Sequence, residues 1–174
     1  MPRIATLEYE QTTGDYRTTF DQGLVKYHRM TNMKRTLLHS IPAYTALMEW
    51  YPLFDCIKEF LGERLSVIFS HAISVESDCL LCTTFMRREL ILWGEDPSKL
   101  VLDEKGEVLV EFGRAIAKQG SRIPDDLFQR VKEHFNTEQI VALTGFASLM
   151  IATNIINSVL EVEVDEHLYE FRPA

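Results

Sequence analysis

Hydrophobic residues recur three and four positions apart through most of the chain, which is the spacing of amphipathic helices. The clearest run covers residues 43–61, where we expect a helix that Pro52 kinks or splits and Gly62 ends. Residues 40–42 precede it with a helix-start signal, because serine caps helices and proline is tolerated in the first turn. A second amphipathic helix is expected at residues 63–75.

Later segments continue the helical pattern. Residues 79–93 form a predicted helix with Asp78 as its N-cap. Residues 100–110 are ambiguous, since residues 103–106 could form a hairpin turn, but a helix at 107–119 fits the pattern better. Two more helices are expected at residues 123–135 and 136–160, and a weaker helical spacing is present between residues 15 and 30.

Strand signals are scarce, and no internal repeat or linker divides the chain. The pattern therefore predicts an all-α fold, in which residues 1–174 form a single domain of about six to eight helices. Residues 1–13 and 163–174 are expected to be irregular, with the acidic positions of the latter in a solvated tail.

The segment 140–160 contains no charged residue and is long enough to cross a bilayer. It also carries two asparagines and four hydroxyl side chains, which a lipid-facing helix rarely tolerates. Helices that are apolar on all sides also occur in protein cores and interfaces. We therefore expect a buried helix of a soluble protein that makes no contact with a membrane.

Composition narrows the class of partner. The chain has 174 residues and a formal net charge of −8, which argues against nucleic acid and anionic membrane surfaces because both select basic proteins. Its N-terminus lacks the apolar stretch of a secretory signal. Three cysteines are too few, and an odd number, for a secreted disulfide framework. A cytoplasmic location is expected, and no cofactor is predicted.

Two of the cysteines lie three positions apart, in the sequence Cys79-Leu80-Leu81-Cys82. The first turn of a helix presents free N–H groups and a partial positive charge, which lower the pKa of a thiol. Three helical steps bring the two sulfurs to nearly the same side, and the two leucines are expected to point into the protein. This arrangement favours a redox-active pair, although inert core cysteines can have the same spacing.

A metal site is the third interpretation of the pair. A single C-x-x-C supplies half of the four ligands of a structural zinc site, and His39 or His71 could complete it only through the fold. We therefore predict no metal centre. Cys56, on the preceding helix, is interpreted as a core residue.

The sequence around the pair resembles the alkylhydroperoxidase D-like (AhpD-like) / carboxymuconolactone decarboxylase family. The likeness spans residues 32–97 and rests on residues 39–42, 77–82 and 93–97. Residues 136–154 are similar to the closing helix of that family. The resemblance implies an all-helical bundle that assembles into homo-oligomers, as dimers, trimers or hexamers.

In the redox branch of that family, a C-x-x-C pair reduces peroxides. The resemblance implies that Cys82 is the attacking thiolate and that Cys79 resolves the sulfenic acid as a disulfide. An external thiol reductant then regenerates the pair. The implied substrate is a small-molecule hydroperoxide or disulfide.

The proton relay of that branch is not reproduced here. Its His and Glu positions are occupied by Met86 and Val67, neither of which transfers protons. His71 lies one helical turn after Val67 and is our candidate for the replacement base, although it could equally be a packed or surface residue. Glu76 is a further candidate proton acceptor.

Three functions compete on these grounds. The first is a thiol peroxidase or thiol–disulfide oxidoreductase that acts through the cysteine pair. The second is a non-catalytic oligomeric protein of the same fold, which the missing relay keeps open. The third is a decarboxylase acting on a small acidic lactone, and the pair counts against it because that branch works without one.

Overall fold

The computed structural model describes residues 1–119 and 122–173, and this part of the chain contains helices and no strands. The predicted all-α fold is therefore confirmed. In chain order the elements are η1 (Tyr9–Gln11), α1 (Gly14–Tyr27), α2 (Asn32–Leu37), α3 (Ile41–Met48), α4 (Trp50–Glu76), α5 (Leu80–Leu92), α6 (Glu104–Gln119), α7 (Asp125–His134), α8 (Thr137–Val159) and η2 (Glu166–Phe171).

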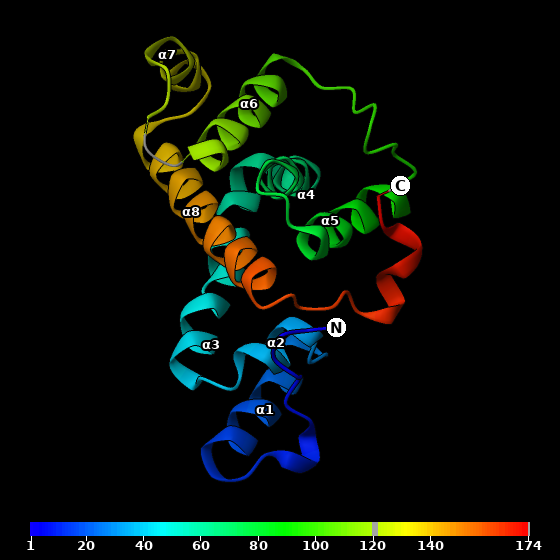
Figure 1. Cartoon of the computed structure of the whole chain (residues 1–174). Coiled ribbons are helices and arrows are strands. Elements are labelled where there is room, and N and C mark those ends of the chain that lie inside the picture. The colour runs from blue at the N-terminus through cyan, green and yellow to red at the C-terminus, as the bar shows by residue number, and fades with distance from the viewer. Residues whose placement is uncertain (120–121, 174) are drawn as a thin grey trace.

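Helix α4 is the centre of a bundle and packs against α5, α6 and α8 (Figure 1). The aromatic side chains of Phe69, Phe112 and Phe146 are fully buried in its core. Gly113 permits the close approach of α6 to α4, because a Cβ atom at this position would lie 2.7 Å from the Phe69 ring. Burial of these large apolar groups stabilises the bundle.

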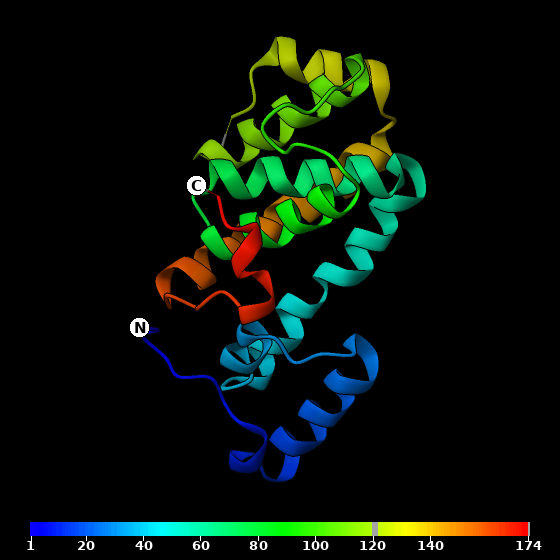
Figure 2. The same cartoon turned by 90° about the vertical axis from the view of Figure 1, so that its right-hand side faces the viewer.

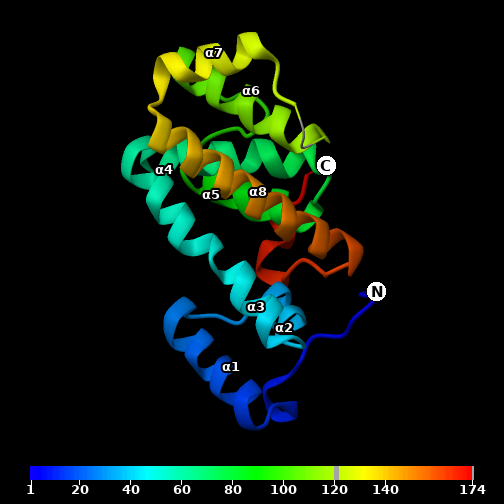
Figure 3. The ribbon, with the colours of Figure 1, turned by 90° about the vertical axis from the view of Figure 1, so that its left-hand side faces the viewer.

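Helices α1, α2 and α3 form an arm at the end of the molecule opposite α7 (Figures 2 and 3). The arm has a small core of its own, centred on Phe20, Leu38 and Tyr44. Met33 and Tyr51 connect it to the bundle. The arm therefore covers one end of α5 and α8 without joining the main core.

Proline and glycine interrupt the helices close to the predicted positions. The helix predicted at residues 43–61 is split at Glu49, between α3 and α4. Glu49 lies about one turn before Pro52, whose ring would clash with a helical carbonyl four residues earlier. Pro52 itself lies in the first turn of α4, where no N–H is needed. Gly62 adopts φ 76° and breaks the helical geometry of α4, as predicted, although the helix resumes directly after it. Ser40 caps α3 through a hydrogen bond from the Ala43 N–H, also as predicted.

Two segments differ from the sequence prediction. Helix α6 begins at Glu104, earlier than the predicted start at residue 107, and the Asp103 carboxylate accepts a hydrogen bond from the Gly106 N–H. The favoured helix is therefore present, and residues 103–106 do not form the alternative hairpin. The tail expected to be irregular contains η2, whose Leu168 and Phe171 are buried against α5. The prediction of an irregular tail rested on the acidic residues of this segment and did not take account of its two buried apolar side chains. Segment 1–13 is irregular apart from η1.

Helix α8 is long and apolar enough to cross a membrane by length and hydropathy alone, a test that the core helices of soluble proteins also pass. In this structure it packs against α4, α5 and α6, and Leu143, Phe146 and Ala147 are fully buried. One face of α8 therefore belongs to the core, whereas Val141, Ile155 and Val159 are exposed on it.

Candidate functional site

The site lies where α4 ends and α5 begins. Asp78 adopts the left-handed conformation with φ 50°, and Cys79 takes the N-cap position of α5. The prediction that Asp78 caps this helix was wrong by one residue. The Cys79 N–H donates instead to the Ser74 carbonyl at 3.1 Å, which ties the N-cap residue to the last turn of α4.

The two cysteines are brought together as expected. Both are free thiols, and the Cys82 thiol donates a hydrogen bond to the Cys79 sulfur. Leu81 is buried between them, but Leu80 is 51% exposed, so the expectation that both leucines point inward was wrong for Leu80. The first helical position of α5 faces solvent because the N-cap is Cys79 and not Asp78.

Cys79 lines an open hollow of about 500 Å³ whose wall mixes polar and apolar residues. Its wall includes Ser158 from the end of α8, and Tyr169 and Arg172 from the C-terminal segment. Cys79 itself is 2% exposed, so the hollow reaches this residue only at one edge. The hollow therefore brings solvent close to Cys79, although little of the residue itself is exposed.

The surroundings of Cys79 lower its pKa to about 7. The largest cause is the hydrogen bond from the Cys82 thiol, which favours the thiolate form. The backbone N–H groups of Cys82 and Leu81 and the Ser158 hydroxyl act in the same direction and outweigh the effect of burial. The thiolate form of Cys79 is therefore favoured more than in an unperturbed cysteine.

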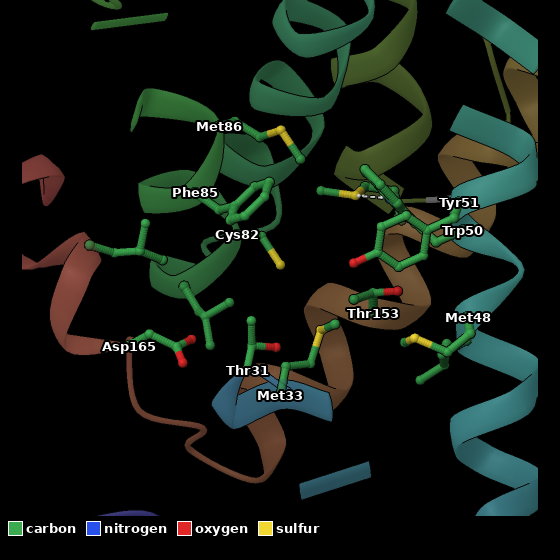
Figure 4. Close-up of a pocket in the computed structure, with 14 residues that line it drawn as sticks. Thr31, Met33, Met48, Trp50, Tyr51, Cys82, Phe85, Met86, Thr153 and Asp165 are labelled. Carbon is green, nitrogen blue, oxygen red and sulfur yellow. Dashed lines mark hydrogen bonds between the residues drawn. The ribbon is translucent and has the colours of Figure 1, made fainter. Parts of the chain in front are cut away.

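Cys82 faces a different space, an apolar cavity of about 80 Å³ (Figure 4). Its thiol pKa is raised well above the usual range by the neighbouring Cys79 and by complete burial, while the Asn157 amide opposes this shift. The Asn157 Nδ2 donates to Cys82 Sγ at 3.2 Å. The remaining wall of this cavity contains four methionines, which are Met33, Met48, Met86 and Met150.

The two predicted relay residues lie outside both hollows. His71 is buried, and burial together with Arg87 and Arg114 lowers its pKa to about 4. Glu76 is exposed in the last turn of α4. Neither residue is among those lining the spaces next to Cys79 and Cys82, so their proposed relay roles remain predictions without geometric support.

The positions that carry the relay in the resembling family are both apolar and buried here. Val67 lies in the main core, and Met86 lies in the core and on the cavity wall beside Cys82. Cys56 is exposed, so its interpretation as a core residue was wrong. Its helix segment places it on the solvent side, one position before buried Ile57.

Several residues of the site were missed from the sequence. Asn157 and Ser158 contact the two sulfurs, and the segment from Val162 to Arg172 forms part of the wall of both hollows. The signal for the first two was present, because polar residues in an otherwise apolar, uncharged helix need partners. No local sequence pattern predicts that the C-terminal segment lines the two hollows, because its position depends on tertiary packing.

The part of the chain that the structure describes contains no group of three His, Cys, Asp or Glu side chains placed to hold a metal ion. No histidine is among the residues that line the two hollows beside the cysteine pair.

The sequence matches no known protein family and no curated protein, but solved structures resemble it. A peroxidase-related protein from Ralstonia eutropha JMP134, described as an alkylhydroperoxidase AhpD core, is 14% identical with a TM-score of 0.74 over 97% of this chain and 94% of its own. A peroxidase-related protein from Silicibacter sp. TM1040 is 16% identical with a TM-score of 0.69, over 97% and 96% of the two chains.

A protein of unknown function from Agrobacterium tumefaciens, which is linked by name to antioxidant defence and AhpD, is 21% identical with a TM-score of 0.60. The match covers 73% of this chain and 93% of the other. The chain has an AhpD-like fold. At these identities the likeness concerns the fold, and it confirms the architecture expected from the resemblance around the cysteine pair.

Proposed function

We propose that this AhpD-like protein is a two-cysteine thiol peroxidase or thiol–disulfide oxidoreductase that cycles between a dithiol and a disulfide. The observations that support the proposal are the position of Cys79 at the start of α5, where its surroundings lower its pKa, and the open hollow that this residue lines. Cys82 donates a hydrogen bond to it and is therefore in position to resolve an oxidised Cys79.

The cysteine roles in this proposal are the reverse of those that the family resemblance implies. The Cys79 thiolate attacks the terminal oxygen of a hydroperoxide, the O–O bond breaks, and the leaving alkoxide takes a proton to become an alcohol. The Cys82 thiol then attacks the sulfenic acid, which forms the disulfide and releases water. An external dithiol reduces the disulfide and is itself oxidised.

The same geometry suits a small disulfide as substrate. The Cys79 thiolate attacks one of its sulfurs, a thiolate leaves, and Cys82 completes the exchange. Tyr169 lies on the wall of the hollow and carries a phenol that can donate a proton to either leaving group. A reducing cytoplasm and self-association into homo-oligomers complete the proposal. Exposed Val141, Ile155 and Val159 on α8 support the self-association.

The second candidate is a non-catalytic oligomeric protein of the same fold. It is favoured by buried, apolar Met86 and Val67 at the two positions where a proton relay is expected. A protein that no longer turns over peroxide has no requirement for a titratable group at either position.

Cysteine substitution separates the two candidates, in a Cys56→Ser background that removes the exposed thiol. Mild cumene hydroperoxide should lower the mass of this protein by two hydrogens, and dithiothreitol should restore it. Cys79→Ser should abolish peroxide consumption, whereas Cys82→Ser should stop after one equivalent and leave a dimedone-reactive sulfenic acid on residue 79.

Each other outcome rejects part of the proposal. A dimedone adduct on residue 82 in the Cys79→Ser variant, together with no adduct on residue 79 in the Cys82→Ser variant, restores the roles implied by the resemblance. A mass that stays unchanged, with no peroxide consumed, supports the non-catalytic protein.

A further inference from the structure

The chain contains six methionines, and four of them line the cavity beside Cys82. They come from separate elements, because Met33 lies on α2, Met48 on α3, Met86 on α5 and Met150 on α8. Figure 4 shows Met33 and Met86 on either side of Cys82, and Met48 directed towards the same space. Helices from the arm and from the bundle thus gather thioether sulfurs around one thiol.

The side-chain amide of Asn157 contacts two sulfur atoms, the thiol of Cys82 and the thioether of Met33. The Asn157 Nδ2 lies 3.2 Å from Cys82 Sγ and 3.5 Å from Met33 Sδ. Met150 is engaged separately, because the Trp50 Nε1–H donates to its sulfur at 3.0 Å. Hydrogen bonds from neighbouring groups that orient ligand atoms are a usual feature of metal sites.

We propose that this cavity binds a monovalent soft metal ion, Cu(I), through Cys82, Met33 and Met86, with Met48 as a further donor. Thiolate and thioether sulfur select Cu(I) over the harder divalent ions. The three rotatable bonds of methionine let its sulfur move onto an ion without moving the helices.

Charge balance favours the same ion. Among the residues that line the cavity, Asp165 is the one acidic side chain, and its Oδ1 is occupied by the Asn32 N–H at 3.0 Å. One thiolate together with Cu(I) is neutral, so the pair can be buried in an apolar cavity at low cost. A divalent ion on the same ligands leaves an uncompensated charge. Binding releases the Cys82 proton, so affinity should rise with pH.

A competition titration under anaerobic conditions tests this site, with Cu(I) itself as the probe and bathocuproine disulfonate as the competing chelator. The reduced wild-type protein should bind one equivalent. Met33→Leu and Met86→Leu should each weaken binding at least tenfold, because leucine preserves the volume but removes the sulfur donor. Met30→Leu is the matched control, since Met30 is buried in the core of the arm and does not line the cavity; it should change affinity less than twofold.

The cysteine pair alone could chelate Cu(I), and the two serine variants distinguish that alternative. Cys82→Ser should abolish binding, and Cys79→Ser should retain it within about threefold, because Cys79 lies on the other hollow. Equal loss in both variants, or wild-type affinity in the two methionine variants, overturns the methionine site. Circular dichroism of every variant checks that the helices are intact.

Discussion

The two sides of the cysteine pair differ in almost every physical property, although the residues are three positions apart. The Cys79 side is open and more polar than the other, with Ser158 and Arg172 among its wall residues. The Cys82 side is small and apolar, and four methionines line it. The N-cap position gives Cys79 the free N–H groups of the helix start, whereas Cys82 is one turn deeper in the core.

This difference separates the two thiols chemically. The neighbouring Cys82 thiol, followed by helix-start N–H groups and the Ser158 hydroxyl, lowers the pKa of Cys79, while the neighbouring Cys79 and burial raise the pKa of Cys82. A C-x-x-C sequence alone does not show which sulfur carries the charge, because both lie in the first turn. The surroundings of the two thiols add to their mutual interaction, and the C-terminal segment contributes to the walls of both hollows.

The largest expected effect is a loss of stability when the apolar cavity beside Cys82 is enlarged. Leu168 in η2 is 1% exposed and lines the Cys82 cavity. Leu168→Ala should lower the free energy of unfolding by about 2–5 kcal/mol, because it removes buried methyl groups and enlarges the cavity. It should also speed alkylation of Cys82 in a Cys56→Ser, Cys79→Ser background. Urea unfolding and iodoacetamide kinetics measure the two effects.

Leu92→Ala is the matched control, since Leu92 lies on α5 but is 56% exposed. It should change the free energy of unfolding by about 0.5 kcal/mol or less. If Leu168→Ala is equally mild, the C-terminal segment is not a structural wall of the cavity and the contrast between the two sides loses its basis.

The prediction with the intermediate effect concerns the pH dependence of stability, and it tests whether His71 acts on either cysteine. Its pKa is about 4 when folded and 6.5 in a model compound, so the unfolded chain binds more protons between these values. Stability is therefore complete above about pH 6.5 and falls as the pH is lowered towards 4. His71 should account for about 2 kcal/mol of the loss between pH 7.5 and pH 5.

His71→Leu should remove that part of the pH dependence and leave alkylation of Cys79 and Cys82 unchanged. His134→Gln, at a half-buried histidine on α7, is the control for the replacement of a histidine as such. A slower alkylation of Cys82 in His71→Leu, with a shifted pH profile, restores the relay role that the sequence proposed for His71.

Local sequence determined most of the fold but only half of the site. The helix limits followed Ser40, Pro52 and Gly62, whose backbone and capping preferences act within one turn. The reactive pair was also predictable, because its spacing and helix-start position are local features. Met33 lies about fifty residues before the pair and Leu168 about eighty-five after it, so their places on the cavity wall depend on tertiary packing that no local pattern encodes.

The smallest expected effect is on the reactivity of Cys79 alone. The Ser158 hydroxyl is one of the groups that lower the pKa of Cys79, and Ser158 is otherwise exposed at the end of α8. Ser158→Ala should therefore raise the Cys79 pKa from about 7 towards 8, as expected for a hydrogen bond to a thiolate worth about 1.4 kcal/mol. Alkylation of Cys79 at pH 6.5 should slow up to tenfold, with the same plateau at high pH and no change in stability.

Ser148→Ala provides the comparison, because Ser148 is also exposed on α8 but donates its hydroxyl to the Thr144 carbonyl, away from the cysteines. It should leave the alkylation profile unchanged. Identical profiles for the two serine variants contradict a thiolate contact at Ser158, and the low pKa of Cys79 then rests on the helix start and the Cys82 thiol alone. A shift confined to Ser158→Ala shows that α8, which closes the bundle, also sets the reactivity of the thiol on α5.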